Sequence, residues 1–319
     1  MPSARYSGRS IFRATLIVAA RRVAVGSTLA LMSIVASLSP QYSLAQHKPA
    51  PLHNSAAPAH HATVRDASFL SDSLGREMRY RVILPAGYEG SADRYPVLFL
   101  LHGLYGDSEN WSTRTSLVRY AEHFRLIIAM PDAGNSWYAN SATVPSDKFE
   151  DYIIKDFLAE VDARFRTIRE PYARAIAGLS MGGYGAIKFA LKYPQLFAVA
   201  GGISAALNAP ADLDDRAPDF RANLQSVFGP HDSETRRQSD PLALLARAEP
   251  SKLPYIYLDC GTGDALFLQS NRELAANLQE RGAAYEFHEM PGAHQWDFWD
   301  AAILRLLDAL ARRSLTSKN

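Results

Sequence analysis

Residues 173–186 constrain the fold of this chain more than any other stretch. A short apolar run ends in a Gly-x-Ser-x-Gly motif centred on Ser180, and a helical pattern begins at once. This strand–turn–helix context is the pattern of a nucleophile elbow, in which the serine occupies a sharp, strained turn. Gly178 and Gly182 lack a Cβ, so strand and helix can approach each other closely. We therefore predict that Ser180 is a catalytic nucleophile; the alternative is a glycine-rich turn with an incidental serine.

Strand-like and helix-like segments alternate on both sides of this motif. Strands are expected at 63–70, 78–84, 95–101, 126–130, 197–203, 255–260 and 285–289. Helices are expected at 115–123, 149–165, 266–281 and 296–312, with another between Ser180 and Pro194 and a short one at 242–248. The first two strands read as an antiparallel hairpin, and the alternation that follows predicts a mostly parallel α/β sheet with helices on both faces.

Two further predicted strand ends carry polar residues that suit nucleophilic catalysis. Asp264 follows the strand at 255–260, and His294 follows the last strand. A serine needs a base to remove its proton, a histidine titrates near neutrality, and a carboxylate orients the imidazole. Ligands bind at the carboxyl ends of parallel strands, and the chain order Ser, Asp, His is that of the α/β-hydrolases. We predict a triad of Ser180, Asp264 and His294.

Two other aspartates lie near the predicted site in sequence. Asp259 falls inside an apolar strand, where the pleat fixes its side chain, and Asp297 opens the last helix, where a carboxylate is favourable for its own reasons. Asp264 lies beyond the strand, and flanking glycines let its loop bend toward His294. The alternatives are a turn-forming Asp264 and a loop or capping His294.

An oxyanion hole needs two backbone N–H donors beside the serine. The Met181 amide, at the start of the new helix, is one candidate. The second is expected in the loop after an early strand, and we assign it to the Leu104 amide within His102-Gly103-Leu104. The alternative, His102 as the catalytic base, is disfavoured because His294 fills that role.

Substrate contacts are less sharply defined by the sequence. Trp137, Tyr138 and Trp296 are candidates for lining the pocket; the alternative for each is ordinary packing. Residues 208–254 break the strand–helix pattern and are rich in Pro, Asp and Arg. We interpret them as an insertion over the edge of the active site.

The N-terminus has the features of an export signal. In residues 1–45 every charge is positive, an uncharged run covers 23–38, and Ser43-Leu44-Ala45 supplies small residues for cleavage before Gln46. We predict a signal peptide at 1–45, a flexible linker at 46–62, a catalytic domain at 63–314, and a secreted or periplasmic protein. The alternative is an uncleaved membrane anchor; after cleavage no stable membrane insertion is expected.

The composition of the chain limits which classes of protein it can belong to. The 319 residues are 47% hydrophobic with a formal net charge of +1, which suits one large α/β domain and gives no basic face for nucleic acid. The single cysteine, Cys260, excludes a disulfide framework and a cysteine metal site, and its apolar surroundings predict a buried core residue. No metal is expected.

Four motifs together resemble a known family. They are Leu101-His102-Gly103-Leu104, the run from Gly178 to Ala186, Cys260-Gly261-Thr262-Gly263-Asp264, and Gly292-Ala293-His294-Gln295-Trp296. In this order they resemble the esterase D and antigen 85 group of α/β-hydrolases over about residues 64–312. The resemblance implies a serine carboxylesterase without a cofactor and supports Leu104 in the oxyanion hole. Asp264 resembles the esterase members, whereas the mycolyltransferases carry a glutamate.

The leading hypothesis is therefore an exported serine esterase that hydrolyses short-chain acyl esters of small molecules through an acyl-enzyme. Alternatives within the same chemistry are an acyltransferase to a sugar or alcohol, and a feruloyl or acetylxylan-type esterase. A cytosolic glutathione thioester is disfavoured by the export signal. A non-catalytic binding protein on a hydrolase scaffold is disfavoured by the complete set of Ser180, Asp264 and His294.

Overall fold

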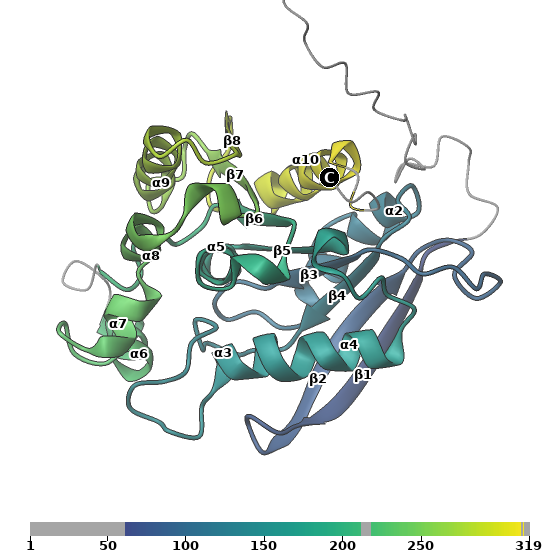
Figure 1. The fold of residues 1–319 in the computed structure, drawn as a ribbon, viewed down its shortest axis with the longest axis horizontal. Coiled ribbons are helices and arrows are strands. Elements are labelled where there is room, and N and C mark those ends of the chain that lie inside the picture. Colours follow the sequence, from purple (N-terminus) through teal and green to yellow (C-terminus); the bar gives the residue numbers. More distant parts are fainter. Residues whose placement is uncertain (1–60, 212–217, 314, 316–319) are drawn as a thin grey trace, which may run out of the picture. The chain divides into compact units, whose positions relative to one another are not determined.

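The computed structural model describes residues 61–211, 218–313 and 315. The expected signal peptide, its alternative as an anchor, and the linker up to residue 60 lie outside the described residues, so they stay predictions. The described residues form one eight-stranded sheet with helices on both faces (Figure 1).

The sheet has the order β1-β2-β4-β3-β5-β6-β7-β8. β1 and β2 form the expected antiparallel hairpin, β2 pairs antiparallel with β4, and every later pair is parallel. The prediction of a mostly parallel α/β sheet is confirmed. The strands are β1 (Thr63–Ser71), β2 (Arg76–Leu84), β3 (Val97–Leu101), β4 (Ile127–Pro131), β5 (Arg174–Leu179), β6 (Val199–Ile203), β7 (Tyr255–Gly261) and β8 (Tyr285–Met290).

The central strands are apolar because both of their faces are covered. Every residue of β3, β4 and β6 is buried. Alternate residues of β3 enter different cores. Phe99 belongs to the core that includes α3 (Phe149–Asp151), α4 (Leu158–Arg164) and α5 (Met181–Lys192). Leu98 belongs to the core that includes α2 (Leu117–Ala121) and α10 (Trp296–Arg312). The two cores hold the helices against opposite faces of the sheet, and Figure 1 shows α10 and α2 apart from α3 and α4.

The helices mostly follow the expected segments. They are α1 (Asn110–Arg114), α2 (Leu117–Ala121), α3 (Phe149–Asp151), the π-helical stretch η1 (Tyr152–Phe157), α4 (Leu158–Arg164), α5 (Met181–Lys192), α6 (Pro218–Phe228), α7 (Glu234–Ser239), α8 (Pro241–Arg247), α9 (Leu268–Glu280) and α10 (Trp296–Arg312). Short 3-10 helices cover Pro171–Ala173, Pro194–Leu196 and Pro250–Lys252.

The helices differ from the sequence prediction in three places. The expected helix at 115–123 is the shorter α2, and α1 before it was not expected. The expected helix at 149–165 contains the π-helical stretch η1 in its middle. In the segment 208–254, α6 and α7 were not expected. Within 208–254, polar caps mark two helix starts: the Ser233 side chain accepts from the Arg236 amide at the start of α7, and Asp240 caps α8 ahead of Pro241.

The described residues contain neither a membrane-spanning helix nor a cluster of metal-binding side chains. None of their helices combines the length and hydropathy required to cross a bilayer. Nor do three or more of their His, Cys, Asp or Glu side chains gather as a metal site would require.

Candidate active site

The turn at Ser180 has the geometry expected of an elbow. Ser180 has φ 52° and ψ −116°, a strained conformation for a non-glycine residue, and it lies between the end of β5 and the first residue of α5. A Cβ on Gly178 would lie 2.5 Å from the carbonyl carbon of Gly182, and one on Gly182 would lie 2.5 Å from the Leu101 oxygen. Both positions therefore require glycine, and the close approach raises Ser180 above the strand ends.

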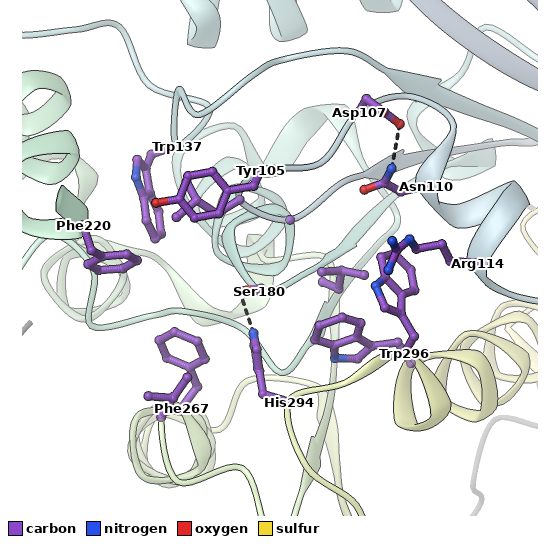
Figure 2. Close-up of a pocket in the computed structure, with 15 residues that line it drawn as sticks. Tyr105, Asp107, Asn110, Arg114, Trp137, Ser180, Phe220, Phe267, His294 and Trp296 are labelled. Carbon is purple, nitrogen blue, oxygen red and sulfur yellow. Dashed lines mark hydrogen bonds between the residues drawn. The ribbon is translucent and has the colours of Figure 1, made fainter. Parts of the chain in front are cut away.

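The structure brings Ser180, His294 and Asp264 into one hydrogen-bonded chain. His294 Nε2 lies 3.1 Å from Ser180 Oγ, and His294 Nδ1 lies 2.9 Å from Asp264 Oδ2. Figure 2 shows the His294 ring reaching Ser180 across the floor of a pocket. Phe267 and Trp299 meet the imidazole edge-to-face at 5.0 and 4.9 Å between ring centroids, which fixes its orientation.

Asp264 is almost completely buried, and its carboxylate is held at both oxygens. The amides of Leu266 and Phe267 donate to Oδ1 at 3.2 Å each, while Oδ2 faces His294. Burial by itself raises the pKa of Asp264, but the hydrogen bond and charge of His294 outweigh it, so this pKa lies below its ordinary value. Asp264 is therefore a carboxylate at neutral pH, the form that orients a histidine.

The acid loop and the histidine loop pack directly against each other. The Gly263 amide donates to the Gly292 oxygen at 2.7 Å, and a Cβ on Gly261 would lie 2.5 Å from that oxygen. The sequence prediction gave Gly261 and Gly263 the task of bending the backbone. Their role in the structure is instead to make space, because the two loops would collide if Gly261 had a side chain.

The other two aspartates lie elsewhere. Asp259 is buried within β7 and accepts hydrogen bonds from Tyr257 at 3.0 Å and Arg305 at 2.8 Å. Asp297 is exposed in the first turn of α10. Of the three, Asp264 is the one that the structure places on His294.

The loop after β3 lies against the elbow. A Cβ on Gly103 would be 2.5 Å from Leu179 Cδ1 and 3.6 Å from Ser180 Cβ. Within the described part of the chain, no hydrogen bond engages the amide of Leu104 or Met181. The N–H groups of both residues therefore have no acceptor among the described residues.

His102 has both ring nitrogens occupied. Nε2 accepts from the Ala133 amide at 3.0 Å, so the proton is on Nδ1, which donates to the Gly103 oxygen at 2.7 Å. Burial lowers the pKa of His102 and keeps it neutral. His102 thus shapes the loop and does not serve as a base.

A cavity of about 580 Å³ opens above Ser180 and His294. It has two unlike sides in Figure 2. On one side of the Ser180–His294 pair lie the aromatic residues Tyr105, Trp137, Phe220 and Phe267. On the other lie Asp107, Asn110 and Arg114 beside Trp296, with the Arg114 guanidinium 5.5 Å above the Trp296 ring.

The predicted substrate contacts are thus met in part. Trp137 and Trp296 line the cavity, but Tyr138 does not, contrary to expectation. Tyr138 is fully buried, because its ring packs against Gly185 and its hydroxyl donates to the His102 oxygen at 2.9 Å. The sequence analysis did not identify several other lining residues: Tyr105, Asp107, Asn110, Arg114, Phe220, Leu266, Phe267 and Trp299. Asp107, Asn110 and Arg114 could have been found, because they follow the end of β3 and ligands bind at such strand ends.

Comparison with known proteins agrees with this geometry. Residues 71–310 match the esterase family, described as "Putative esterase". The chain belongs to the esterase family. An acetyl esterase of Caldicellulosiruptor saccharolyticus is 26% identical over 79% of this chain and 99% of its own length. An esterase of Mycobacterium tuberculosis is 33% identical over 71% of this chain, which spans 54% of that longer relative.

A solved structure gives the same result. The fluorophosphonate-binding serine hydrolase F of Staphylococcus aureus, with substrate bound, superposes with a TM-score of 0.71 and 31% identity over 79% of this chain and 99% of its own. The resemblance to the esterase D and antigen 85 group and the α/β-hydrolase fold are confirmed. This member of the esterase family is a carboxylic ester hydrolase.

Proposed function

We propose that this chain is an exported serine carboxylesterase that hydrolyses short-chain acyl esters through a triad of Ser180, His294 and Asp264. The observation that carries the proposal is the continuous hydrogen-bonded chain from Asp264 through His294 to Ser180, at the floor of an open cavity. Its donor–acceptor distances are those of a nucleophile, a base and an orienting acid.

The reaction follows from these positions. As Ser180 Oγ attacks the ester carbonyl carbon, His294 Nε2 takes its proton, and the Asp264 carboxylate stabilises the imidazolium. The tetrahedral intermediate expels the alcohol, which receives the proton from His294. Water then attacks the acyl-enzyme with His294 again as base, and this step releases the acid and restores Ser180.

The oxyanion of both tetrahedral intermediates needs preorganised donors. We assign this role to the Leu104 and Met181 amides, which no hydrogen bond within the described residues engages. The Met181 amide begins α5, so the helix dipole adds a partial positive charge there.

The substrate class is inferred from the cavity and the relatives. The acetyl esterase relative supports a short acyl group. The side of the cavity with Asp107, Asn110 and Arg114 offers hydrogen-bonding groups beside the Trp296 ring, which suits a hydroxyl-rich alcohol. This polar side also favours the second candidate function, acyl transfer to a sugar or alcohol, and the opposite aromatic side would accept a feruloyl group.

Kinetics with ester panels test the proposal. We expect kcat/KM to be higher for p-nitrophenyl butyrate than for the decanoate, and Ser180→Ala to abolish turnover of both. A higher kcat/KM on the decanoate would contradict the short-chain preference, and high turnover of methyl ferulate would favour the feruloyl alternative. Adding an alcohol acceptor and analysing the products separates hydrolysis from transfer.

Export is a separate part of the proposal. The arginine-rich start, the apolar run at 23–38 and Ser43-Leu44-Ala45 support cleavage before Gln46 and a secreted or periplasmic location. N-terminal sequencing of protein collected outside the cytoplasm should begin at or near Gln46. Intact Met1 in a membrane fraction would favour the anchor instead.

A further inference from the structure

Trp137 in the cavity wall and the buried Tyr138 that follows it have a backbone conformation that such bulky residues rarely adopt. Trp137 has φ 54° and Tyr138 has φ 51°, both in the left-handed region. This conformation is strained for residues that carry a side chain, and it persists only where the surrounding structure determines it. The turn at Trp137 and Tyr138 must therefore be held from outside.

A buried lysine holds this turn. The Lys188 side chain is 0% exposed, and its ammonium donates to the Tyr138 oxygen at 2.5 Å and to Glu150 Oε2 at 2.9 Å. Lys188 is on α5, eight residues after Ser180, so the helix that begins at the serine also reaches the turn. Neither Lys188 nor Glu150 lines the cavity.

The charges of this pair are balanced within the protein. Glu150 also accepts from Lys192 at 2.5 Å and from the Tyr193 hydroxyl at 2.6 Å. Burial alone raises the pKa of Glu150, but the two lysines outweigh it and bring this pKa to about 2. Burial lowers the pKa of Lys188, and the charge and hydrogen bond of Glu150 oppose this lowering. The carboxylate therefore favours the charged form of the ammonium beside the Tyr138 carbonyl.

Two neighbours of Lys188 on α5 fit the same turn. A Cβ on Gly185 would lie 2.7 Å from Tyr138 Cδ2, so glycine is required there to admit the Tyr138 ring. Tyr184 meets the Trp137 ring edge-to-face with the centroids 5.8 Å apart. One face of α5 is thus shaped around Trp137 and Tyr138.

The turn at Trp137 and Tyr138 in turn positions the loop after β3. The Tyr138 hydroxyl donates to the His102 oxygen at 2.9 Å, and the same oxygen would lie 2.6 Å from a Cβ on Gly182 of the elbow. Gly103 and Leu104 follow directly. A continuous set of contacts therefore runs from α5 through Tyr138 to the backbone that carries the Leu104 amide.

We propose that Lys188 is a positioning residue: through the Tyr138 carbonyl it fixes the strained turn, and through the Tyr138 hydroxyl it fixes the oxyanion loop beside Ser180. The inference rests on the proposed esterase function. A displacement of about 1 Å at a catalytic donor can cost about a hundredfold in rate, so a strut outside the cavity can control kcat.

Lys188 and Lys192 both donate to Glu150, so replacing each of them in turn gives a matched pair of variants. Lys188→Met keeps the length of the side chain but removes the donor to the Tyr138 oxygen. Lys192→Met removes a lysine that donates to Glu150 but not to Tyr138. With p-nitrophenyl butyrate we expect Lys188→Met to lower kcat at least about tenfold with KM within about threefold. Lys192→Met should leave kcat within about threefold. Equal kcat values for the two variants would overturn the inference.

A double-mutant cycle tests the shared path. Tyr138→Phe removes one hydroxyl and breaks the contact with His102, so it should also lower kcat. The double variant Lys188→Met/Tyr138→Phe should lose no more than the worse single variant, because both act on the same loop. Additive losses would contradict a common path. If Lys188→Met fails to fold, an unchanged kcat in folded Tyr138→Phe is sufficient to overturn the proposal.

Wild type and Ser180→Ala, measured beside these variants, separate the two claims. Turnover that depends on Ser180, together with wild-type kcat in folded Lys188→Met, would reject the positioning role alone. Absence of any Ser180-dependent turnover in the wild type would reject the proposed function and this inference with it.

Discussion

Asp259 and Asp264 lie five residues apart, are both buried, and each pairs with one basic side chain, yet the structure gives them different surroundings. Asp259 lies in β7 on the face toward α10, where its partner Arg305 is permanently charged. Asp264 lies past the strand end, where its partner His294 has a second nitrogen 3.1 Å from Ser180.

The comparison shows that burial and pairing do not by themselves mark a catalytic acid. Arg305 cannot exchange a proton at ordinary pH, so the Asp259 pair can contribute only to stability. In the proposed mechanism, His294 accepts the proton of Ser180, and Asp264 orients the imidazole for this step. Two features therefore distinguish a catalytic carboxylate from a structural one in this proposal. Its basic partner can exchange a proton, and the second nitrogen of that partner reaches the nucleophile.

The largest expected effect is on Asp264. Asp264→Asn should lower kcat by about two to four orders of magnitude, because the amide no longer holds His294 in the correct tautomer. Steady-state kinetics on p-nitrophenyl butyrate, with circular dichroism to verify folding, measures it. A near-normal kcat would show that another residue is the catalytic acid, and that Asp264 has no catalytic role that Asp259 lacks.

The matched change at Asp259 should act on stability. Asp259→Asn weakens the contact with Arg305, which is 29% exposed, so we expect about 1–3 kcal/mol of lost unfolding free energy and kcat within about threefold of wild type. Urea unfolding monitored by fluorescence gives the first value. A hundredfold loss of kcat in the folded variant would make Asp259 part of the catalytic machinery.

Asp297 provides a control at the surface. It is exposed in the first turn of α10, three residues beyond His294, and the described structure gives it no contact with the imidazole. Asp297→Asn should lower kcat less than about tenfold, since only a helix-end interaction is lost. A decrease in kcat as large as that of Asp264→Asn would show that Asp297 takes part in catalysis.

The smallest expected effect concerns the pH dependence of stability. The pKa of Asp264 in the folded protein lies below the ordinary value of 3.8, so its ionised form stabilises the fold above that pH. This contribution is lost as pH falls through the folded pKa, and Asp264→Asn lacks it. The difference in unfolding free energy between wild type and Asp264→Asn should shrink below about pH 4. A difference that stays constant from pH 6 to pH 3 would contradict the lowered pKa.

Much of this arrangement follows from sequence because it depends on local patterns. Apolar runs predicted the strands, and Ser180, Asp264 and His294 each follow the end of a predicted strand. In a parallel sheet such ends meet at one edge, so residues far apart in sequence could be grouped before any coordinates were known.

The remainder depends on tertiary packing that no local pattern reports. Trp137 and Tyr138 carry no glycine or asparagine signal for their positive φ, so the turn that buries Tyr138 could not be anticipated. Lys188 reads as an ordinary helix lysine, since lysines are rarely fully buried, and only Glu150, 38 residues earlier, makes its burial possible. The helices of the segment 208–254 are likewise set by caps and by packing.

The central claim is that Ser180 is the nucleophile activated by His294 and oriented by Asp264. A fluorophosphonate probe, which labels an activated serine, tests it most directly on the purified chain. We predict rapid labelling of wild type, much slower labelling of Asp264→Asn, and none of Ser180→Ala. Labelling that persists in Ser180→Ala would contradict the account, because the activated serine would then lie elsewhere in the chain.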